Sequence, residues 1–217
     1  MHMVQAVVFD MDGVILNTEA ICRRTWRLAG KKYGLTEAAA EKGFVATIGC
    51  NRTDTHEKLC DLYGADFPAD DYMQQTSAFF HEIESAEGIP LMQGVRLALD
   101  YLKKEKYRVA LASSTRRAVV ERQLKTAGVF DYFETVTAGD DVVHSKPDPE
   151  IYLMACRSLG IAPGVCAAIE DSPNGIRSAY AAGLKCIMVP DQVQPDDEIR
   201  GMLWHLCSSL CEIPDVL

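Results

Sequence analysis

Residues 4–13 read Val4-Gln-Ala-Val-Val-Phe-Asp-Met-Asp-Gly13, an apolar run that stops at two aspartates and a glycine. The run has no basic leader and passes straight into charge, so it predicts a buried strand and not a signal peptide. Further apolar runs occupy 109–112, 165–169 and 186–189, with a weaker one at 135–138. Helical patterns fill the intervals between them. Short apolar strands that alternate with helices predict an α/β fold with a parallel sheet buried on both faces.

The spacing of these runs predicts two domains. About a hundred residues separate the first run from the second, whereas a simple strand–helix–strand unit needs about thirty. The interval contains helical stretches at about 18–33, 53–63 and 71–85, and none of its apolar segments resembles a buried parallel strand. We therefore expect residues 15–86 to form an all-helical insert, and residues 1–14 and 87–217 to form the α/β core.

Composition excludes several classes of protein. The chain has 217 residues, of which 48% are hydrophobic and 24% charged, as in ordinary globular proteins. Its 22 basic and 31 acidic residues give a net charge of −9, which disfavours nucleic acid as a partner. No apolar run approaches the roughly 18 residues of a membrane helix. The eight cysteines are scattered without a C-x-x-C pair, which indicates reduced thiols and a cytoplasmic protein. We separately expect a monomer or weak homo-oligomer.

Polar residues follow each predicted strand where an open α/β sheet collects its ligands. Four carboxylates, a lysine and a hydroxyl should meet at this edge: Asp10, Asp12, Glu170, Asp171, Lys146 and Ser113. Like charges gathered in this way are costly without a cation, and an all-oxygen ligand set suits Mg²⁺.

Each of these residues also has a simpler interpretation. Two aspartates as close as Asp10 and Asp12 should titrate as a coupled pair, which a nucleophile beside a general acid/base requires, but D-x-D-G also occurs as a plain turn. Thr115 could cap the helix that follows Ser113. Lys146 could lie on the surface, and Glu170 with Asp171 could complement the dipole of the helix that begins at Pro173.

Four segments resemble the motifs of the haloacid dehalogenase superfamily, most closely its β-phosphoglucomutase and sugar-phosphatase branch. They are Phe9-Asp-Met-Asp-Gly-Val14, Leu111-Ala-Ser-Ser114, Ser145-Lys-Pro-Asp-Pro-Glu-Ile-Tyr152 and Ile169-Glu-Asp-Ser-Pro-Asn-Gly-Ile176. The resemblance covers nearly the whole chain, with the motifs in the family's order. It implies a Rossmann-like core of three α/β/α layers and a helical cap domain inserted after the first motif.

The resemblance also implies roles for individual residues. Asp10 would attack phosphorus and become an aspartyl phosphate, while Asp12 would protonate the leaving oxygen and then deprotonate water. Ser113 and Lys146 would hold the phosphoryl oxygens. Mg²⁺ would bind to Asp10, the Asp12 carbonyl and Asp171, with Glu170 as a direct or water-mediated ligand. Candidate contacts to substrate, phosphate or a neighbouring carboxylate are Ser114 and Asn174 in the core and Gly49 and Arg52 in the insert.

The choice between phosphatase and mutase depends on the insert. β-Phosphoglucomutases resemble this chain but carry a histidine where it has Cys22, and a late cap lysine that is missing between Lys58 and Lys103. Asn17 also replaces the aspartate of the family's D-T-E pattern. The Gly49–Arg52 segment does resemble the mutases' loop for a second phosphate, although a surface arginine is an equal alternative. We expect a Mg²⁺-dependent phosphatase of a small phosphomonoester such as a sugar phosphate, with a phosphosugar mutase as the alternative.

A different class of function also fits some of these residues. A phosphoryl-accepting switch gathers acidic residues, a hydroxyl and a lysine at its strand ends as well. A binding protein without catalysis is a further alternative. Receiver domains of about 120 residues have no helical insert of this size, which favours the enzyme.

Overall fold

All five apolar runs form strands of one parallel sheet in the computed structural model, which describes residues 4–48, 50 and 52–217. The strands are β1 (Ala6–Phe9), β2 (Arg108–Ala112), β3 (Thr135–Thr137), β4 (Cys166–Glu170) and β5 (Lys185–Met188). A sixth, β6 (Leu203–Leu206), completes the order β3-β2-β1-β4-β5-β6, with every neighbouring pair parallel. The predicted α/β fold with a Rossmann-like sheet is confirmed.

The register brings the carboxyl ends of the central strands level with one another. Phe9, the last residue of β1, pairs with Leu111 on one side and Ile169 on the other. Asp10 therefore emerges next to the ends of β2 and β4, and its amide still donates to the Ile169 carbonyl at 2.9 Å. This alignment gathers the residues that follow each strand at one edge of the sheet.

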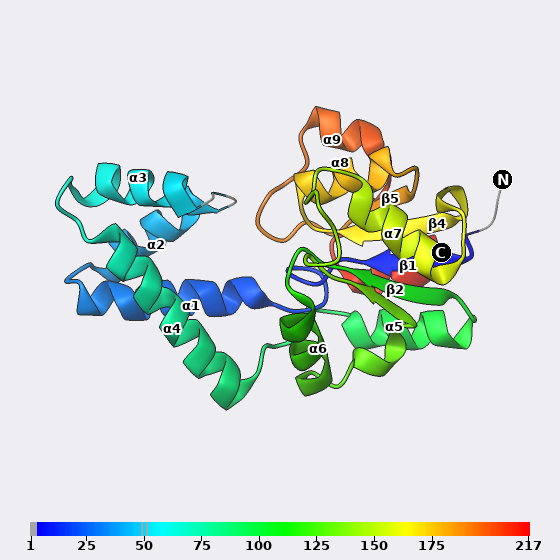
Figure 1. Cartoon of the computed structure of the whole chain (residues 1–217), viewed down its shortest axis with the longest axis horizontal. Coiled ribbons are helices and arrows are strands. Elements are labelled where there is room, and N and C mark those ends of the chain that lie inside the picture. The colour runs from blue at the N-terminus through cyan, green and yellow to red at the C-terminus, as the bar shows by residue number, and fades with distance from the viewer. Residues whose placement is uncertain (1–3, 49, 51) are drawn as a thin grey trace. The chain divides into compact units, whose positions relative to one another are not determined.

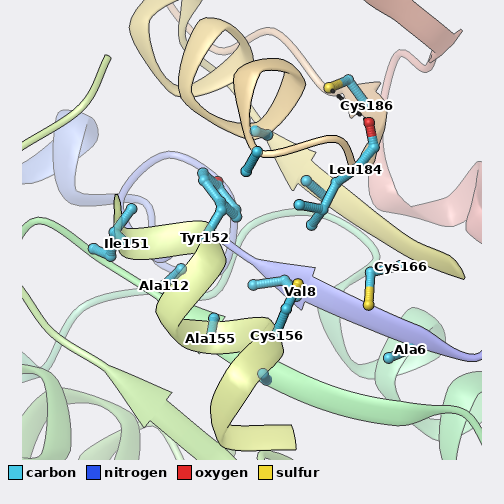
Figure 2. Close-up of a cluster of buried hydrophobic side chains, with 14 of the residues drawn as sticks. Ala6, Val8, Ala112, Ile151, Tyr152, Ala155, Cys156, Cys166, Leu184 and Cys186 are labelled. Atoms are coloured by element: carbon cyan, nitrogen blue, oxygen red, sulfur yellow. Dashed lines mark hydrogen bonds between the residues drawn. The ribbon is translucent and has the colours of Figure 1, made fainter. Parts of the chain in front are cut away.

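Helices cover both faces of this sheet (Figure 1). Ile151, Tyr152, Ala155 and Cys156 of α7 (Glu150–Leu159) pack against small side chains of the sheet, among them Val8 and Ala112 (Figure 2). The other helices associated with the sheet are α5 (Val95–Lys104), α6 (Arg117–Thr126), α8 (Pro173–Ala181), α9 (Asp197–Met202) and α10 (Ile213–Val216). Short 3₁₀ turns lie at Phe130–Tyr132, Pro163–Val165 and Leu210–Glu212.

The chain divides into two units, Met1–Asn17 with Pro90–Leu217, and Thr18–Ile89. The second unit consists of α1 (Thr18–Lys32), α2 (Glu37–Thr47), α3 (Arg52–Tyr63) and α4 (Ala69–Glu87). Its core is aromatic, and the buried Tyr72 ring contacts Trp26 edge to face while its hydroxyl donates to the Trp26 carbonyl at 2.8 Å. Among the described residues no helix is both long and apolar enough to cross a bilayer.

The helical unit leaves and rejoins the sheet-containing unit through paired backbone. The Asn17 amide donates to the Pro90 carbonyl at 2.8 Å, and the Met92 amide donates to the Ile15 carbonyl at 3.0 Å. An isolated antiparallel bridge joins Leu16 to Leu91 between them. We call these two segments, 15–17 and 90–92, the entry–exit ladder; both lie within the sheet-containing unit.

Candidate active site

Buried ion pairs of Lys146, in the loop before α7, connect this loop to the carboxyl ends of β1 and β4. The Lys146 ammonium donates to Asp10 Oδ1 at 2.6 Å and to Glu170 Oε1 at 2.7 Å. It also donates to the Ala112 carbonyl at the end of β2, at 3.1 Å. The side chains of Asp10, Lys146 and Glu170 are 10%, 9% and 1% exposed. Lys146 therefore joins three neighbouring strands at the edge where the sequence predicted a site.

Glu170 is surrounded by hydrogen-bond donors. Besides Lys146, Oε1 accepts from the Tyr152 hydroxyl at 2.9 Å. Oε2 accepts from the amides of Asp171 at 3.1 Å and Ser172 at 3.2 Å, and from the Ser172 hydroxyl at 3.1 Å. A carboxylate has about four lone-pair sites, and these five donors are enough to occupy them. Glu170 is thus arranged to hold Lys146 and the start of α8.

Burial and like charge act together on the carboxyl groups. Desolvation, reinforced by Glu170 and Asp12, raises the pKa of Asp10 from 3.8 to about 8 despite the Lys146 ammonium. Desolvation and the charges of Glu170, Asp10 and Asp191 raise the pKa of Asp171 to about 9. Burial opposes ionisation of Lys146 and Glu170 as well. Attraction to Asp10 and Glu170 nevertheless raises the lysine pKa, and attraction to Lys146 lowers the glutamate pKa.

Three carboxylates are close enough to share a metal ion. Asp10, Glu170 and Asp171 each offer an oxygen, and these atoms lie within 4.8 Å of one another. The all-oxygen set fits a hard divalent cation such as Mg²⁺. The raised pKa values of Asp10 and Asp171 fit it too, because a cation between them would favour the ionised forms that burial disfavours. The residues present are therefore suited to the metal.

Asp12, the second aspartate, lies beside the loop after β2. Its Oδ2 accepts a hydrogen bond from the Thr115 hydroxyl at 2.9 Å. The Thr115 amide in turn donates to Ser113 Oγ at 3.1 Å, and Ser113 is fully buried. The structure thus brings Asp12 and Ser113 together through Thr115, for which capping of a helix was one alternative.

Of the alternatives left open for Thr115, the capping role does not apply. The helix cap of α6 is Arg116, whose side chain makes no capping bond. Asp140 supplies the cap instead, because its Oδ1 accepts from the Arg117 amide at 2.8 Å. Asp141, next in the chain, pairs with the Arg117 guanidinium. Both acidic residues after β3 therefore stabilise the start of α6.

Two glycines permit the close approach of the acidic groups. A Cβ at position 175 would overlap the Glu170 carboxylate, and a Cβ at position 13 would overlap that of Asp171. Gly13 also has a φ of +78°, a backbone conformation that residues other than glycine adopt only with strain. Any larger residue at either position would displace the carboxylate it faces.

Other predicted residues lie outside this buried network. Ser114 and Asn174 are exposed, Ser114 in the loop after β2 and Asn174 in the first turn of α8. Arg52 begins α3 of the helical unit, where its exposed side chain pairs with Asp70 at 2.8 Å. Gly49 falls outside the described residues. Substrate contact by any of these four stays a prediction.

Tyr152, Thr115 and Ser172 contribute contacts that motif spacing did not assign. Tyr152 stands inside a quoted motif, and its hydroxyl reaches Glu170 only because α7 packs across the sheet (Figure 2). Its ring also lies 5.0 Å from the Lys146 ammonium. Ser172 caps α8, since its hydroxyl oxygen accepts from the Gly175 amide at 3.1 Å. Its second contact, to Glu170, had no local signal.

Comparison with known proteins assigns the chain to a family. The model of the haloacid dehalogenase-like hydrolases matches residues 7–189. A phosphorylated carbohydrates phosphatase of Thermotoga maritima is 31% identical over 84% of this chain and 83% of its own length. Protein CbbY of Rhodobacter capsulatus is 30% identical over 93% of this chain and 92% of its own.

A solved structure agrees in fold as well as in sequence. A Thermotoga maritima protein provisionally named β-phosphoglucomutase matches with a TM-score of 0.80 and 28% identity, over 98% of each chain. The family match includes all four quoted motifs, strands β2 to β5 and all of β1 except its first residue. With Asp10, Lys146, Glu170 and Asp171 gathered at one edge of that sheet, the chain belongs to the haloacid dehalogenase-like hydrolases.

Proposed function

We propose that the protein is a Mg²⁺-dependent phosphatase of a small phosphorylated metabolite such as a sugar phosphate, acting through an aspartyl phosphate on Asp10. The convergence of Asp10, Lys146 and Ser113 beside a second aspartate carries the proposal. Phosphoryl transfer needs a positioned nucleophile and neutralisation of charge on the equatorial oxygens more than covalent chemistry. The relative that acts on phosphorylated carbohydrates supports this substrate class.

In this proposal each side chain has one task. An Asp10 carboxylate oxygen forms a bond to phosphorus as the ester oxygen departs. The Asp12 carboxyl gives that oxygen its proton and later removes a proton from the water that cleaves the aspartyl phosphate. Lys146 and Ser113 orient the phosphoryl oxygens, and Glu170 holds Lys146 in place. Ser114 and Asn174 are candidates for further contacts with the phosphate or the metal ligands.

A Mg²⁺ ion would be held by Asp10 and Asp171, with the Asp12 carbonyl as a third ligand and Glu170 acting through water. When bound it supplies positive charge that neutralises the phosphoryl oxygens and keeps the nearby carboxylates ionised. The metal would favour the ionised, nucleophilic form of Asp10, whose pKa of about 8 would otherwise leave it largely protonated at neutral pH. The helical unit would act as the cap domain that selects the leaving group, with Gly49 and Arg52 as candidate contacts.

A phosphosugar mutase is the second candidate, favoured by the similarity to the provisionally named β-phosphoglucomutase. Cys22 in place of a histidine and the lysine-free stretch between Lys58 and Lys103 weigh against it. A mutase would convert β-glucose 1-phosphate to the 6-phosphate faster than it releases inorganic phosphate, so the two products separate the candidates directly.

The test is phosphate release from a panel of sugar, polyol and nucleotide monophosphates, with Mg²⁺ and with a chelator. We expect metal-dependent release that Asp10→Asn abolishes, because the amide cannot act as the nucleophile. Asp131→Asn, the same change at an exposed aspartate, is the matched control and should retain full activity. Absence of phosphate release across the panel would contradict the phosphatase and favour the mutase or a switch. A phosphoprotein that persists for hours after treatment with acetyl phosphate would favour the switch.

A further inference from the structure

Thr115 connects two groups of the proposed machinery that come from different strands. Its hydroxyl donates to Asp12 Oδ2 at 2.9 Å, beyond the end of β1. Its amide donates to Ser113 Oγ at 3.1 Å, beyond the end of β2. The residue is half-buried, and since it does not cap α6, the hydroxyl's contact with Asp12 has no role in helix formation.

The backbone fixes the position of Thr115 independently of Asp12. The Thr115 carbonyl accepts from the Gly139 amide at 2.9 Å, and the Ser113 amide donates to the Thr137 carbonyl at 3.0 Å. A Cβ at position 139 would overlap the Ser114 carbonyl, so the two loops are in direct backbone contact. A hydroxyl mounted on such a support can orient a neighbouring carboxyl group with little motion of its own.

We propose that Thr115 is a positioning residue, which orients the Asp12 carboxyl so that it delivers its proton to the leaving oxygen. The role rests on the proposed phosphatase function. Because the hydroxyl donates to Oδ2, that atom acts as the accepting oxygen of the acid form, and the proton is directed onto Oδ1. Thr115 acts through Asp12 and touches no reacting atom.

The step in which this matters is the first transfer. The bond from Asp10 to phosphorus forms while the bond from phosphorus to the ester oxygen breaks. The electron pair of the broken bond stays on the leaving oxygen, which takes the Asp12 proton and departs as an alcohol. A leaving group of high pKa needs that proton, whereas one of low pKa departs readily as an anion.

Replacing Thr115 should therefore have an effect that depends on the leaving group. For Thr115→Val, which preserves shape but removes the hydroxyl, we expect kcat/KM to fall about tenfold for alkyl phosphates. For 4-nitrophenyl phosphate we expect a fall of less than about twofold, because little proton transfer is needed. A plot of log kcat/KM against leaving-group pKa becomes steeper. Since kcat/KM covers only the steps up to departure of the leaving group, the rate at which the aspartyl phosphate breaks down does not affect kcat/KM.

Two variants separate positioning from packing. Thr115→Ser retains the hydroxyl and should restore the shallow slope of the unmodified protein. Thr126→Val makes the same substitution at the far end of α6, where the exposed hydroxyl bonds only to the Arg122 carbonyl at 2.9 Å, and should change nothing. If Thr115→Val fails to fold, Thr115→Ala compared with Thr115→Ser makes the same test.

An equal loss for every leaving group, or no loss, would overturn the positioning role while leaving the phosphatase intact. Absence of phosphate release by the unmodified protein from every ester would instead reject the phosphatase, and this role with it. A steeper slope in Thr115→Val that Thr115→Ser reverses is the result expected.

Discussion

At the scale of single residues, Tyr152 shows how a hydrophobic helix face supplies one polar atom to the site. Its ring packs among Ile151, Ala155 and Cys156 in the layer that α7 forms against the sheet (Figure 2). Its hydroxyl ends at Glu170 Oε1, 2.9 Å away, where it partners a carboxylate that is 1% exposed. Phenylalanine would fill the same volume and leave this buried charge with one donor fewer.

Tyr152→Phe should therefore lower stability more than activity. We expect the free energy of unfolding to fall by about 1.5–3 kcal/mol, the usual range for a hydrogen bond to a charged group. The remaining donors, Lys146 among them, should keep the loss in kcat/KM below about tenfold. Denaturant unfolding and steady-state kinetics measure the two effects. Tyr180→Phe, at a 53% exposed tyrosine on α8, is the control; equal stability of the two variants would contradict this account.

Several of the predicted site residues could be found because they stand at the end of a predicted strand. Asp10, Ser113 and Glu170 could be placed together because parallel strands end at one edge. Lys146 lies in a loop after β3, and its motif indicated its place. Thr115 and Tyr152 could not be assigned in this way, because their contacts cross from one loop or helix to another strand. Such contacts depend on three-dimensional packing, which spacing along the chain does not encode.

At the scale of elements, the start of α8 serves the site as well as the helix. Ser172 accepts from the Gly175 amide at 3.1 Å, which caps the helix, and donates to Glu170 Oε2 at 3.1 Å. Gly175 lies in the same turn and leaves room for the Glu170 carboxylate. The helix cap and the orientation of a buried carboxylate therefore depend on one hydroxyl.

Ser172→Ala should lose both contacts at once. We expect the free energy of unfolding to drop by about 1–2 kcal/mol for the missing cap, with a further contribution from the donor lost to Glu170. Ser158→Ala removes a hydroxyl that bonds only to carbonyls of α7 and should have little effect. Ser172→Thr keeps the hydroxyl and should recover most of the loss. A thermal unfolding midpoint for Ser172→Ala equal to that of Ser158→Ala would show that the contacts contribute nothing.

Elements with a clear apolar pattern were predicted, and several with a weak pattern were missed, among them β6 and α2. β6 lies at the edge of the sheet, where Trp204 and His205 are half-buried and its four residues do not form an apolar run. α2 contains Gly43, and a Cβ there would overlap the Tyr63 hydroxyl. A glycine therefore stands at a buried helix position where an amphipathic pattern would have a large apolar residue. Edge exposure and small-residue packing both remove the periodicity on which sequence reasoning depends.

At the scale of the whole molecule, the acidic cluster sets a pH dependence. The pKa values of Asp10 and Asp171 lie at about 8 and 9, above the ordinary 3.8. The metal-free folded protein therefore holds protons that the unfolded chain releases. The associated stability is fully present below about pH 4 and is lost as the pH rises through 8 to 9. A cation that binds the ionised carboxylates should reverse this loss.

We expect the rise in melting temperature caused by a fixed Mg²⁺ concentration to be larger at pH 8 than at pH 6. At the lower pH, metal binding must first displace protons from Asp10 and Asp171, which weakens the apparent affinity. Thermal unfolding with Mg²⁺, with a chelator and with sodium chloride of equal ionic strength measures the effect. Asp171→Asn should remove it, and Asp131→Asn should not. An equal Mg²⁺ effect at both pH values would contradict the linkage.

The entry–exit ladder has a consequence for how such a protein can change over evolution. Because Asn17 and Pro90 are hydrogen-bonded to each other within the sheet-containing unit, the two ends of the helical segment 18–89 are attached at neighbouring positions. A gene segment that encodes residues 18–89 could be lengthened, replaced or recombined without separating the strands that hold Asp10 and Lys146. If the helical unit selects the substrate, as proposed, exchange of residues 18–89 alone could change the substrate preference while the residues around Asp10 and Lys146 stay the same.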